Sequence, residues 1–461
     1  MNAKTLYKII PFILLLAIVL FAALFTNSVK RADEINHLVS QLKTGDIYSK
    51  EKTALALAKF GTPATKPLVK LLGDNDDDVA LAAAIALGNM GAPSIAPLKL
   101  ALNDGNEDIR ANATIALSAN KDPRSIDLMV SALRDKSKYV RNLAALGFKD
   151  KEKKAFDAVL SVLRDNNPLF RAPAATALGQ IKDKRAVVPL IEALEDSDKV
   201  VRTLAAQALG FIKDSRAVEP LLNLIAKRDE YTTARYRAIQ ALGIIETPRA
   251  VEPLANILEN PKESSMVRFA AASALGRIKD PRVIPLLSAA LRDSDADVRE
   301  SAGRSLGFMD SSATKVLVVA LKDPSTDVRS NAALALGYSS DKNAVEPLIV
   351  ALKDKDTKVR TKVACALSVK DDKHANSALL NALKSNDLNI VSGAYSFFIK
   401  QGKPGSESIL INALRLHGNL TMAEDYFSSN NIKLRKAAVT WAKQHGEKLE
   451  ESIFEPRWGE R

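Results

Sequence analysis

A short pattern recurs along this chain of 461 residues at intervals of 30 to 33 residues. It consists of an apolar residue and Arg, followed by Ala-Ala and Ala-Leu-Gly, and Val201–Gly210 is a complete copy. The marker Arg, whose row we name the Arg ladder, is present in nine consecutive copies: Arg110, Arg141, Arg171, Arg202, Arg235, Arg268, Arg299, Arg329 and Arg360. A period of this length predicts stacked structural repeats instead of the separate globular domains that a chain of this size otherwise forms.

The second half of each repeat has the pattern of a helix, which we name helix B. It follows an Asp-containing turn such as Asp196–Asp198, and an Asp side chain can accept hydrogen bonds from the free N–H groups at a helix start. Counted from the marker Arg, positions +3, +4 and +6 are mostly Ala and position +7 is mostly Leu, which places them on one helical stripe. Small residues on this stripe, continued by Gly at position +8, allow another helix to approach closely.

The first half of each repeat predicts a shorter helix, helix A, with the pattern Pro-Leu-x-x-x-Leu. Pro189–Leu194 and Pro347–Leu352 are examples, and the Pro stands near the helix start, where its missing N–H costs least. Two short helices cannot bury their apolar faces by themselves, but stacked pairs can. The sequence therefore predicts an all-α fold in which helical hairpins stack into a solenoid.

The complete repeat resembles the HEAT repeat, in the short variety known from phycobilisome lyases. Its signature, Asp-x-Arg-Ala-Val-x-Pro-Leu and then Asp-x-x-Val-Arg-x-x-Ala-Ala-x-Ala-Leu-Gly, is clearest at Asp183–Gly210 and Asp214–Gly243, and the resemblance covers about residues 35–400. The resemblance implies a right-handed α-solenoid of about 12–13 HEAT-like hairpins. It does not imply one function, because this repeat family serves many roles.

An apolar run, Ile9–Phe25, precedes the repeats. With its flanks, residues 6–29, it is long enough to cross a hydrocarbon core of about 30 Å as a helix. The alternative is a cleaved or uncleaved signal sequence, but the apolar part of a signal peptide usually has about 7 to 15 residues. We therefore expect an N-terminal transmembrane helix and a single-pass membrane protein.

The side of the membrane is less determined, because Lys and Arg are almost equally frequent at the two ends of the apolar run. We expect the solenoid on the extracytoplasmic side, and the cytoplasmic side stays open. The predicted organisation is a short tail at 1–5, the anchor at 6–29, the repeat solenoid at 32–400, and divergent terminal helices with a polar tail at 401–461.

Residues suited to catalysis or metal binding are few in this chain. The single cysteine, Cys365, excludes a disulfide framework and a multi-cysteine metal site. No His-Glu pair occurs, which excludes the di-iron site of deoxyhypusine hydroxylase, an enzyme that shares this repeat type. The acidic turn Gly73–Asp78 lacks the Gly and Glu of a calcium loop and is interpreted as a helix cap. We expect no enzymatic activity, no cofactor and no metal.

The Arg ladder has two interpretations. The HEAT resemblance implies a structural role, in which an Arg near the start of helix B faces an Asp in a neighbouring turn, and Asp108, Asp297 and Asp327 are nearby candidates. The alternative is a stripe of cations that binds anions or acidic partners. We expect the structural role.

The distribution of charge argues against nucleic acid as a partner. The formal net charge of +12 comes from 66 basic and 54 acidic residues, and Lys4, Lys8, Lys30 and Arg31 flank the apolar run. The remaining positive charge is spread thinly along the repeats, whereas a nucleic-acid site requires basic residues gathered on one face.

Positions +1, +2, +5 and +9 of helix B vary between repeats while the rest of the pattern is constant. In the central repeats they hold Phe211, Tyr236, Arg237, Gln240, Phe269, Arg277, Arg304, Phe308 and Tyr338. If helix B lines the concave face, as in HEAT-like stacks, these residues form a groove with the aromatic and Arg anchors typical of protein-binding hot spots. The alternative is that the aromatic residues at +9 pack back onto the end of their own helix.

The sequence thus predicts a membrane-tethered, non-catalytic scaffold that binds a protein partner through the concave helix-B face. Two alternatives stay open. One is a bilin-lyase-like protein or chromophore chaperone, which shares the repeat, and the other is a nucleic-acid-binding HEAT-like protein.

Overall fold

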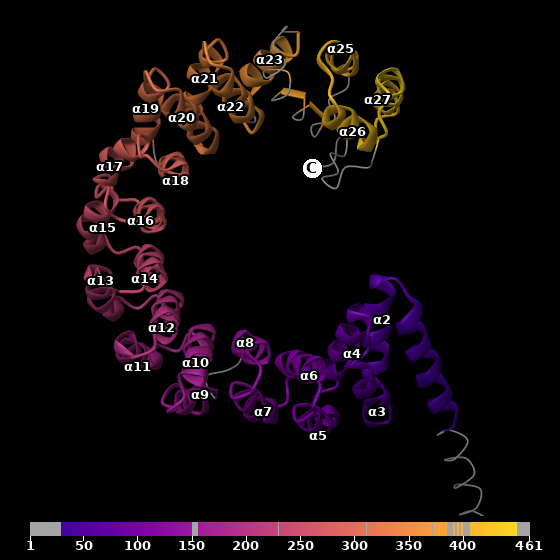
Figure 1. Ribbon diagram of the computed structural model, residues 1–461. Coiled ribbons are helices and arrows are strands. Elements are labelled where there is room, and N and C mark those ends of the chain that lie inside the picture. The colour runs from indigo at the N-terminus through magenta and orange to yellow at the C-terminus, as the bar shows by residue number, and fades with distance from the viewer. Residues whose placement is uncertain are drawn as a thin grey trace, which may run out of the picture. The chain divides into compact units, whose positions relative to one another are not determined.

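The protein folds into helical hairpins in two layers, as the computed structural model shows (Figure 1). The structure describes residues 29–149, 155–370 except 229 and 310, 372–384 and 406–449, with residues 391, 394, 395, 398 and 399. These residues form helices, turns and loops and no strand, which confirms the all-α class. The chain divides into an N-terminal unit, Met1–Ala217, and a C-terminal unit, Val218–Arg461.

In the N-terminal unit, the helices that carry the marker positions pack side by side in one layer, the helix-B layer. Its members are α2 (Ile47–Ala58), α4 (Asp77–Asn89), α6 (Glu107–Ala119), α8 (Lys138–Leu146), α10 (Pro168–Ile181) and α12 (Lys199–Ile212). The helix-A layer consists of α3 (Thr62–Leu71), α5 (Ala92–Ala101), α7 (Arg124–Ala132), α9 (Phe156–Leu163) and α11 (Val187–Glu192), with the 3-10 turns η2 (Lys184–Ala186), η3 (Ala193–Glu195) and η4 (Ser215–Ala217). Residues 29–44, before α2, are also helical.

The C-terminal unit repeats the same two layers. Its helix-B layer contains α14 (Thr232–Ile245), α16 (Ser265–Ile278), α18 (Ala296–Gly307), α20 (Thr326–Tyr338) and α22 (Thr357–Ser368). Its helix-A layer contains α13 (Val218–Ala226), α15 (Val251–Leu258), α17 (Val283–Ala290), α19 (Ser311–Ala320), α21 (Val345–Ala351) and α23 (Lys373–Ala382), with η5 (Pro248–Ala250) and η6 (Lys342–Ala344). From residue 406 to residue 449 the structure describes α25 (Glu407–His417), α26 (Leu420–Ser428) and α27 (Ile432–His445).

Neighbouring B helices approach closely through the predicted stripe of small residues. Ala205, Ala206 and Leu209 of α12 are completely buried. A Cβ atom at Gly243 of α14, at position +8, would lie 2.8 Å from the Cα atom of Ala274 in α16, which is closer than real Cβ contacts. The Ala and Gly positions therefore set the spacing of the helix-B layer, and large side chains are left for its surface.

The predicted membrane anchor is not supported by the structure. Residues 6–28 lie outside the described residues, and residue 29 belongs to the helical stretch 29–44. Among the helices that the structure describes, none is both long and apolar enough to cross a membrane. The predicted single-pass localisation is wrong on this finding, and the function proposed below contains no membrane tether. The handedness, the number of hairpins and the boundaries at 32–400 and 401–461 stay predictions.

Candidate functional site

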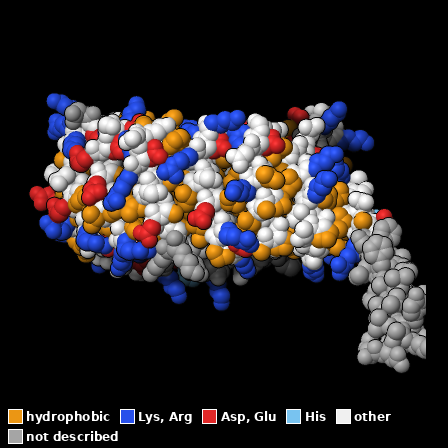
Figure 2. Space-filling view, turned by 90° about the horizontal axis from the view of Figure 1, so that it is seen from below, with side chains coloured by type: hydrophobic (Ala, Val, Ile, Leu, Met, Phe, Trp, Pro, Cys, Tyr) orange, Lys and Arg blue, Asp and Glu red, His pale blue; other side chains and the backbone are white. Residues whose placement is uncertain are grey.

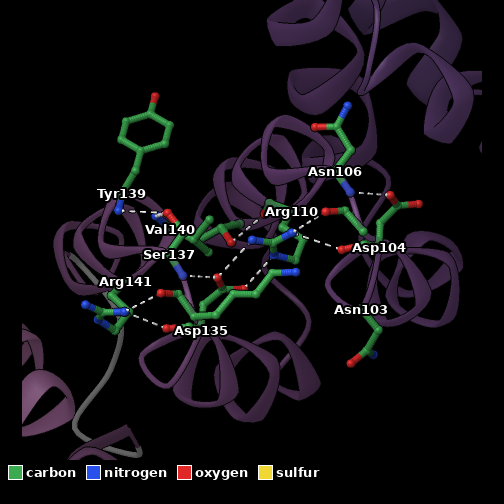
Figure 3. Close-up of polar contacts among 12 residues, drawn as sticks. Asn103, Asp104, Asn106, Arg110, Asp135, Ser137, Tyr139, Val140 and Arg141 are labelled. Carbon is green, nitrogen blue, oxygen red and sulfur yellow. Dashed lines mark hydrogen bonds and ion pairs between the residues drawn. The ribbon is translucent and has the colours of Figure 1, made fainter.

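The guanidinium groups of the Arg ladder lie in the turns that precede helix B. Arg110 donates from Nε and Nη2 to the carboxylate of Asp135 at 2.8 and 3.2 Å, and from Nη1 to the carbonyl oxygens of Asp104 and Gly105 (Figure 3). The carbonyl oxygen of Asp135 in turn accepts a hydrogen bond of 2.7 Å from Arg141. Only 4% of the Arg110 side chain and 9% of the Asp135 side chain are exposed. Arg110 therefore joins the turn of its own repeat to that of the next.

The same contact recurs along both units. The further pairs are Arg171–Asp196, Arg235–Glu263, Arg268–Asp293, Arg299–Asp327 and Arg329–Asp354. Arg202 and Arg360 donate to the carbonyl oxygens of Asp196 and Asp354, as Arg141 does to that of Asp135. The acidic partner belongs to the following repeat. Of the three nearby candidates, Asp327 is bound by Arg299, whereas Arg110 pairs with Asp135 and not with Asp108. Most of the ladder is buried, which leaves little of it to present to an acidic partner.

Four ladder carboxylates, Asp196, Asp293, Asp327 and Asp354, have lowered pKa values, and the first, second and fourth share one balance of causes. Burial raises the pKa of Asp196, but the hydrogen bonds from Arg171 and from the backbone N–H of Asp198 outweigh burial and bring the pKa below 3.8. The same balance, with Arg268 and Arg329 as donors, lowers the pKa of Asp293 and Asp354. The folded state therefore favours the ionised form of these four groups.

Acid should consequently destabilise the repeats. A carboxyl group whose pKa is lower in the folded state stabilises the fold above its unfolded pKa, and this contribution is lost as the pH falls through the folded pKa. We expect the urea midpoint, followed by circular dichroism, to fall as the pH is lowered from about 4, the pKa of an unfolded Asp, towards about 2. Asp354→Asn should flatten this profile, and an unchanged midpoint across this range would contradict the prediction.

Three of the predicted surface residues meet at one groove in the C-terminal unit. Tyr236 and Arg237 of α14 and Phe269 of α16, all half-buried, line a cavity of about 540 Å³. Arg237 donates to Gln240 at 2.9 Å, and Gln240 donates to the hydroxyl of Tyr236 at 2.9 Å. The guanidinium of Arg237 also lies 5.6 Å from the centre of the Tyr236 ring. These contacts hold the polar side of the groove in one arrangement.

Five other residues complete the lining, and the variable positions of helix B did not identify them. They are Thr233, Ser265, Met266, Asp295 and Asp297. Each stands at the start of a B helix, before the marker Arg, where the sequence pattern indicates only capping. Met266 is 50% exposed, which is unusual for Met, but this exposure is seen only in the structure.

The remaining predicted residues lie elsewhere. Arg304, Phe308 and Tyr338 form a second cluster, in which the Phe308 and Tyr338 rings are 5.4 Å apart and the Arg304 guanidinium lies 5.9 Å from the Tyr338 ring. Phe308 thus contacts the next repeat and is 60% exposed, instead of packing only on its own helix end. Arg277 is exposed at the end of α16.

Phe211 belongs to the N-terminal unit. It is half-buried at the end of α12, where one of its ring carbons would lie 3.5 Å from a Cβ atom at Gly179. It therefore packs over the close contact between α10 and α12 and is not part of the groove.

The acidic turn Gly73–Asp78 has a structural role at the start of α4. Asp76 in the acidic turn caps α4 through the N–H groups of Asp78 and Val79. In the part of the chain that the structure describes, no group of His, Cys, Asp and Glu side chains is placed to hold a metal ion. Burial raises the pKa of the Cys365 thiol, which disfavours the nucleophilic thiolate.

Charge and apolar side chains are mixed on the face drawn in Figure 2. Lys and Arg are interspersed with Asp, Glu and apolar groups and do not gather in one patch there. This face lacks the clustered basic surface that nucleic-acid binding requires.

Solved structures with the same kind of fold are numerous. Yeast importin-β (Kap95p) is similar over 90% of this chain and 67% of its own, at 13% identity and a TM-score of 0.51, which shows the fold alone. The CpcE–CpcF complex of phycocyanin lyase from Nostoc sp. PCC7120 is 26% identical over 48% of this chain and 92% of that chain, with a TM-score of 0.34. Human deoxyhypusine hydroxylase is 22% identical over 53% of this chain and 96% of its own, with a TM-score of 0.25. The last two likenesses carry no inference about activity.

No curated protein matches this chain. The HEAT-repeat family matches residues 35–99, 156–235, 224–307 and 314–396, which together are more than half of the sequence. The two helical layers and the recurring Arg–acid contacts agree with this match. The chain therefore belongs to the HEAT-repeat family.

Proposed function

We propose that this chain is a non-catalytic scaffold that binds a protein partner through its helix-B layer. The observation that supports this function is the groove at Tyr236, Arg237 and Phe269. Aromatic and Arg side chains set in a concave site are the residues that most often dominate protein-binding energy. A cavity of about 540 Å³ is also large enough for one or two side chains of a partner.

The packing of the repeats supports the same function, because the repeats pack against each other without requiring Tyr236, Arg237 or Phe269. The contacts between B helices are made by Ala, Leu and Gly, and the ladder joins the turns. Tyr236 and Arg237 bind each other and Gln240 but keep part of their surface in the groove. Large side chains that a repeat does not require for packing are available for recognition.

The double substitution Tyr236→Ala and Arg237→Ala should weaken partner binding at least about tenfold, the effect of losing one modest hot spot. The measurement is quantitative capture of proteins from a lysate of the source cells, followed by binding of the purified partner. A matched control is Lys99→Ala with Leu100→Ala, which removes an exposed cation and apolar side chain from α5 in the helix-A layer.

The control should capture the same partner as the unmodified protein, and all three proteins should have the same helix content and urea midpoint. Equal capture by the double variant would contradict a role for the groove. Enrichment of no protein by the unmodified chain would contradict the scaffold function itself.

A further inference from the structure

The groove has different chemistry on its three helices. Arg237 and Tyr236 stand on α14, Met266 and Phe269 stand on α16, and the carboxylates of Asp295 and Asp297 stand at the start of α18. α16 packs between α14 and α18. The groove therefore has a basic wall at Arg237, an apolar floor at Met266 and Phe269, and an acidic wall at Asp295 and Asp297. This order is a property of the stacked repeats, because the three pairs come from three different repeats.

The two charged walls are available for a ligand. Among the ion pairs of the described residues, none involves Arg237 or Asp297. Asp327, which has the same position in the next repeat as Asp297, is bound by Arg299 at 3.1 Å and by Lys358. Asp295 caps α18 by accepting hydrogen bonds from the N–H groups of Asp297 and Val298, so its carboxylate is held in place on the same wall.

The spacing of the helices determines which peptide can bridge these walls. Packed helices are about 8–10 Å apart. A peptide in the polyproline II conformation advances about 3.1 Å per residue and has three residues per turn. Every third side chain therefore lies on the same face, about 9 Å from the previous side chain on that face. A segment that crosses α14, α16 and α18 therefore presents one side chain to each helix at positions i, i+3 and i+6.

We propose that the groove binds an extended peptide segment of a partner protein with an acidic, an apolar and a basic side chain at this spacing. The acidic group pairs with Arg237, the apolar group lies on Met266 and Phe269, and the basic group pairs with Asp297. This inference rests on the proposed scaffold function and specifies the chemistry of the partner.

Fluorescence anisotropy with blocked, labelled heptapeptides tests this chemistry on the full chain. The probe is Glu-Pro-Pro-Leu-Pro-Pro-Lys, and the comparison peptides replace its Lys with Glu, its Glu with Lys, or its Leu with Gly. An exposed ion pair contributes less than about fivefold in affinity, and reversal also adds repulsion, so each charge reversal should weaken binding about tenfold. The Gly peptide should bind more weakly than the probe as well.

Asp297→Lys should invert the preference, so that the peptide with two Glu residues binds most tightly. The matched control is Asp108→Lys, because Asp108 is exposed at the equivalent position of α6, where the groove residues are absent. This control should keep the original preference, and it also accounts for the loss of an acid from the first turn of a B helix.

Two results would overturn the inference. One is equal binding, or no binding, of all four peptides, and the other is an unchanged preference in Asp297→Lys. In either case the proposed scaffold function is judged separately, by whether a partner is captured and is lost from the Tyr236 and Arg237 variant. If the Tyr236 and Arg237 variant loses the captured partner but the four peptides bind equally, the groove recognises a partner with other side chains than those in the probe.

Discussion

Replacing Arg329 with Met should lower the free energy of unfolding of the C-terminal unit by about 3–5 kcal/mol. The Arg329 side chain is 5% exposed and that of its partner Asp354 is 11% exposed. Removing the guanidinium leaves a buried carboxylate without its counter-ion, and the carbonyl oxygens of Asp323 and Pro324 lose a donor. The cost is that of an uncompensated buried charge, which exceeds the net value of the pair itself.

The measurement is urea unfolding followed by circular dichroism, with hydrogen exchange to locate the loss of protection in α20 and α22. Arg282→Met is the matched control, because Arg282 forms the same kind of contact with Asp280 but its side chain is 67% exposed. An exposed pair contributes about 0–1 kcal/mol. The double variant Arg329→Met with Asp354→Asn should recover much of the loss. Equal costs for Arg329→Met and Arg282→Met would show that the ladder does not join the repeats.

Replacing Gly243 with Val should destabilise the same unit by about 3 kcal/mol, at the upper end of the usual cost of overpacking. A Cβ atom at this position would be 2.8 Å from both Cα and Cβ of Ala274. Because one of these atoms belongs to the backbone of α16, the contact cannot be relieved by turning a side chain. The helices must separate, and the buried Ala and Leu contacts on both sides weaken with them.

Gly105→Val is the control for this substitution, since a Cβ atom at Gly105 meets no atom within 4 Å. A change within about 0.5 kcal/mol is expected there. Ala274→Gly should partly restore the stability of Gly243→Val by making room in α16. Failure of this second substitution to restore any stability would indicate that the loss has another origin than the contact between α14 and α16.

The two-layer fold was predictable because the information is repeated along the chain. Nine copies of one pattern identify the helix-B positions, and Ala and Gly at fixed places indicate which surface is buried. The membrane localisation was predicted from a single apolar run with no such repetition, and no described helix supports it. An interpretation of one apolar run cannot be compared with other copies, whereas each of the nine repeats can be compared with the other eight.

Only three of the eight residues that line the candidate site were predicted from the sequence. Variation at positions +1 and +2 identified Tyr236, Arg237 and Phe269. Positions that pack between helices hold mostly the same residue types from repeat to repeat, whereas positions that packing does not require differ between repeats. Met266 and Asp297 were missed, because the sequence pattern assigns residues in the first turn of a helix to helix initiation and capping. In the sequence, Asp297 is 60 residues from Arg237, and only the stacking of three repeats brings them to one groove.

The sequence by itself determined the repeat, the helices and their buried stripe, because these depend on residues near each other in the chain. The tertiary structure decided the contacts between repeats. It showed that Arg110 reaches the carboxylate of Asp135 in the next repeat, although Asp108 is only two residues away. It also decided that the groove passes from Arg237 over Phe269 to Asp297. The physical reason is the same in both cases: neighbouring helices lie about 8–10 Å apart, so a side chain at the start of one helix can touch the next repeat, which no local spacing rule describes.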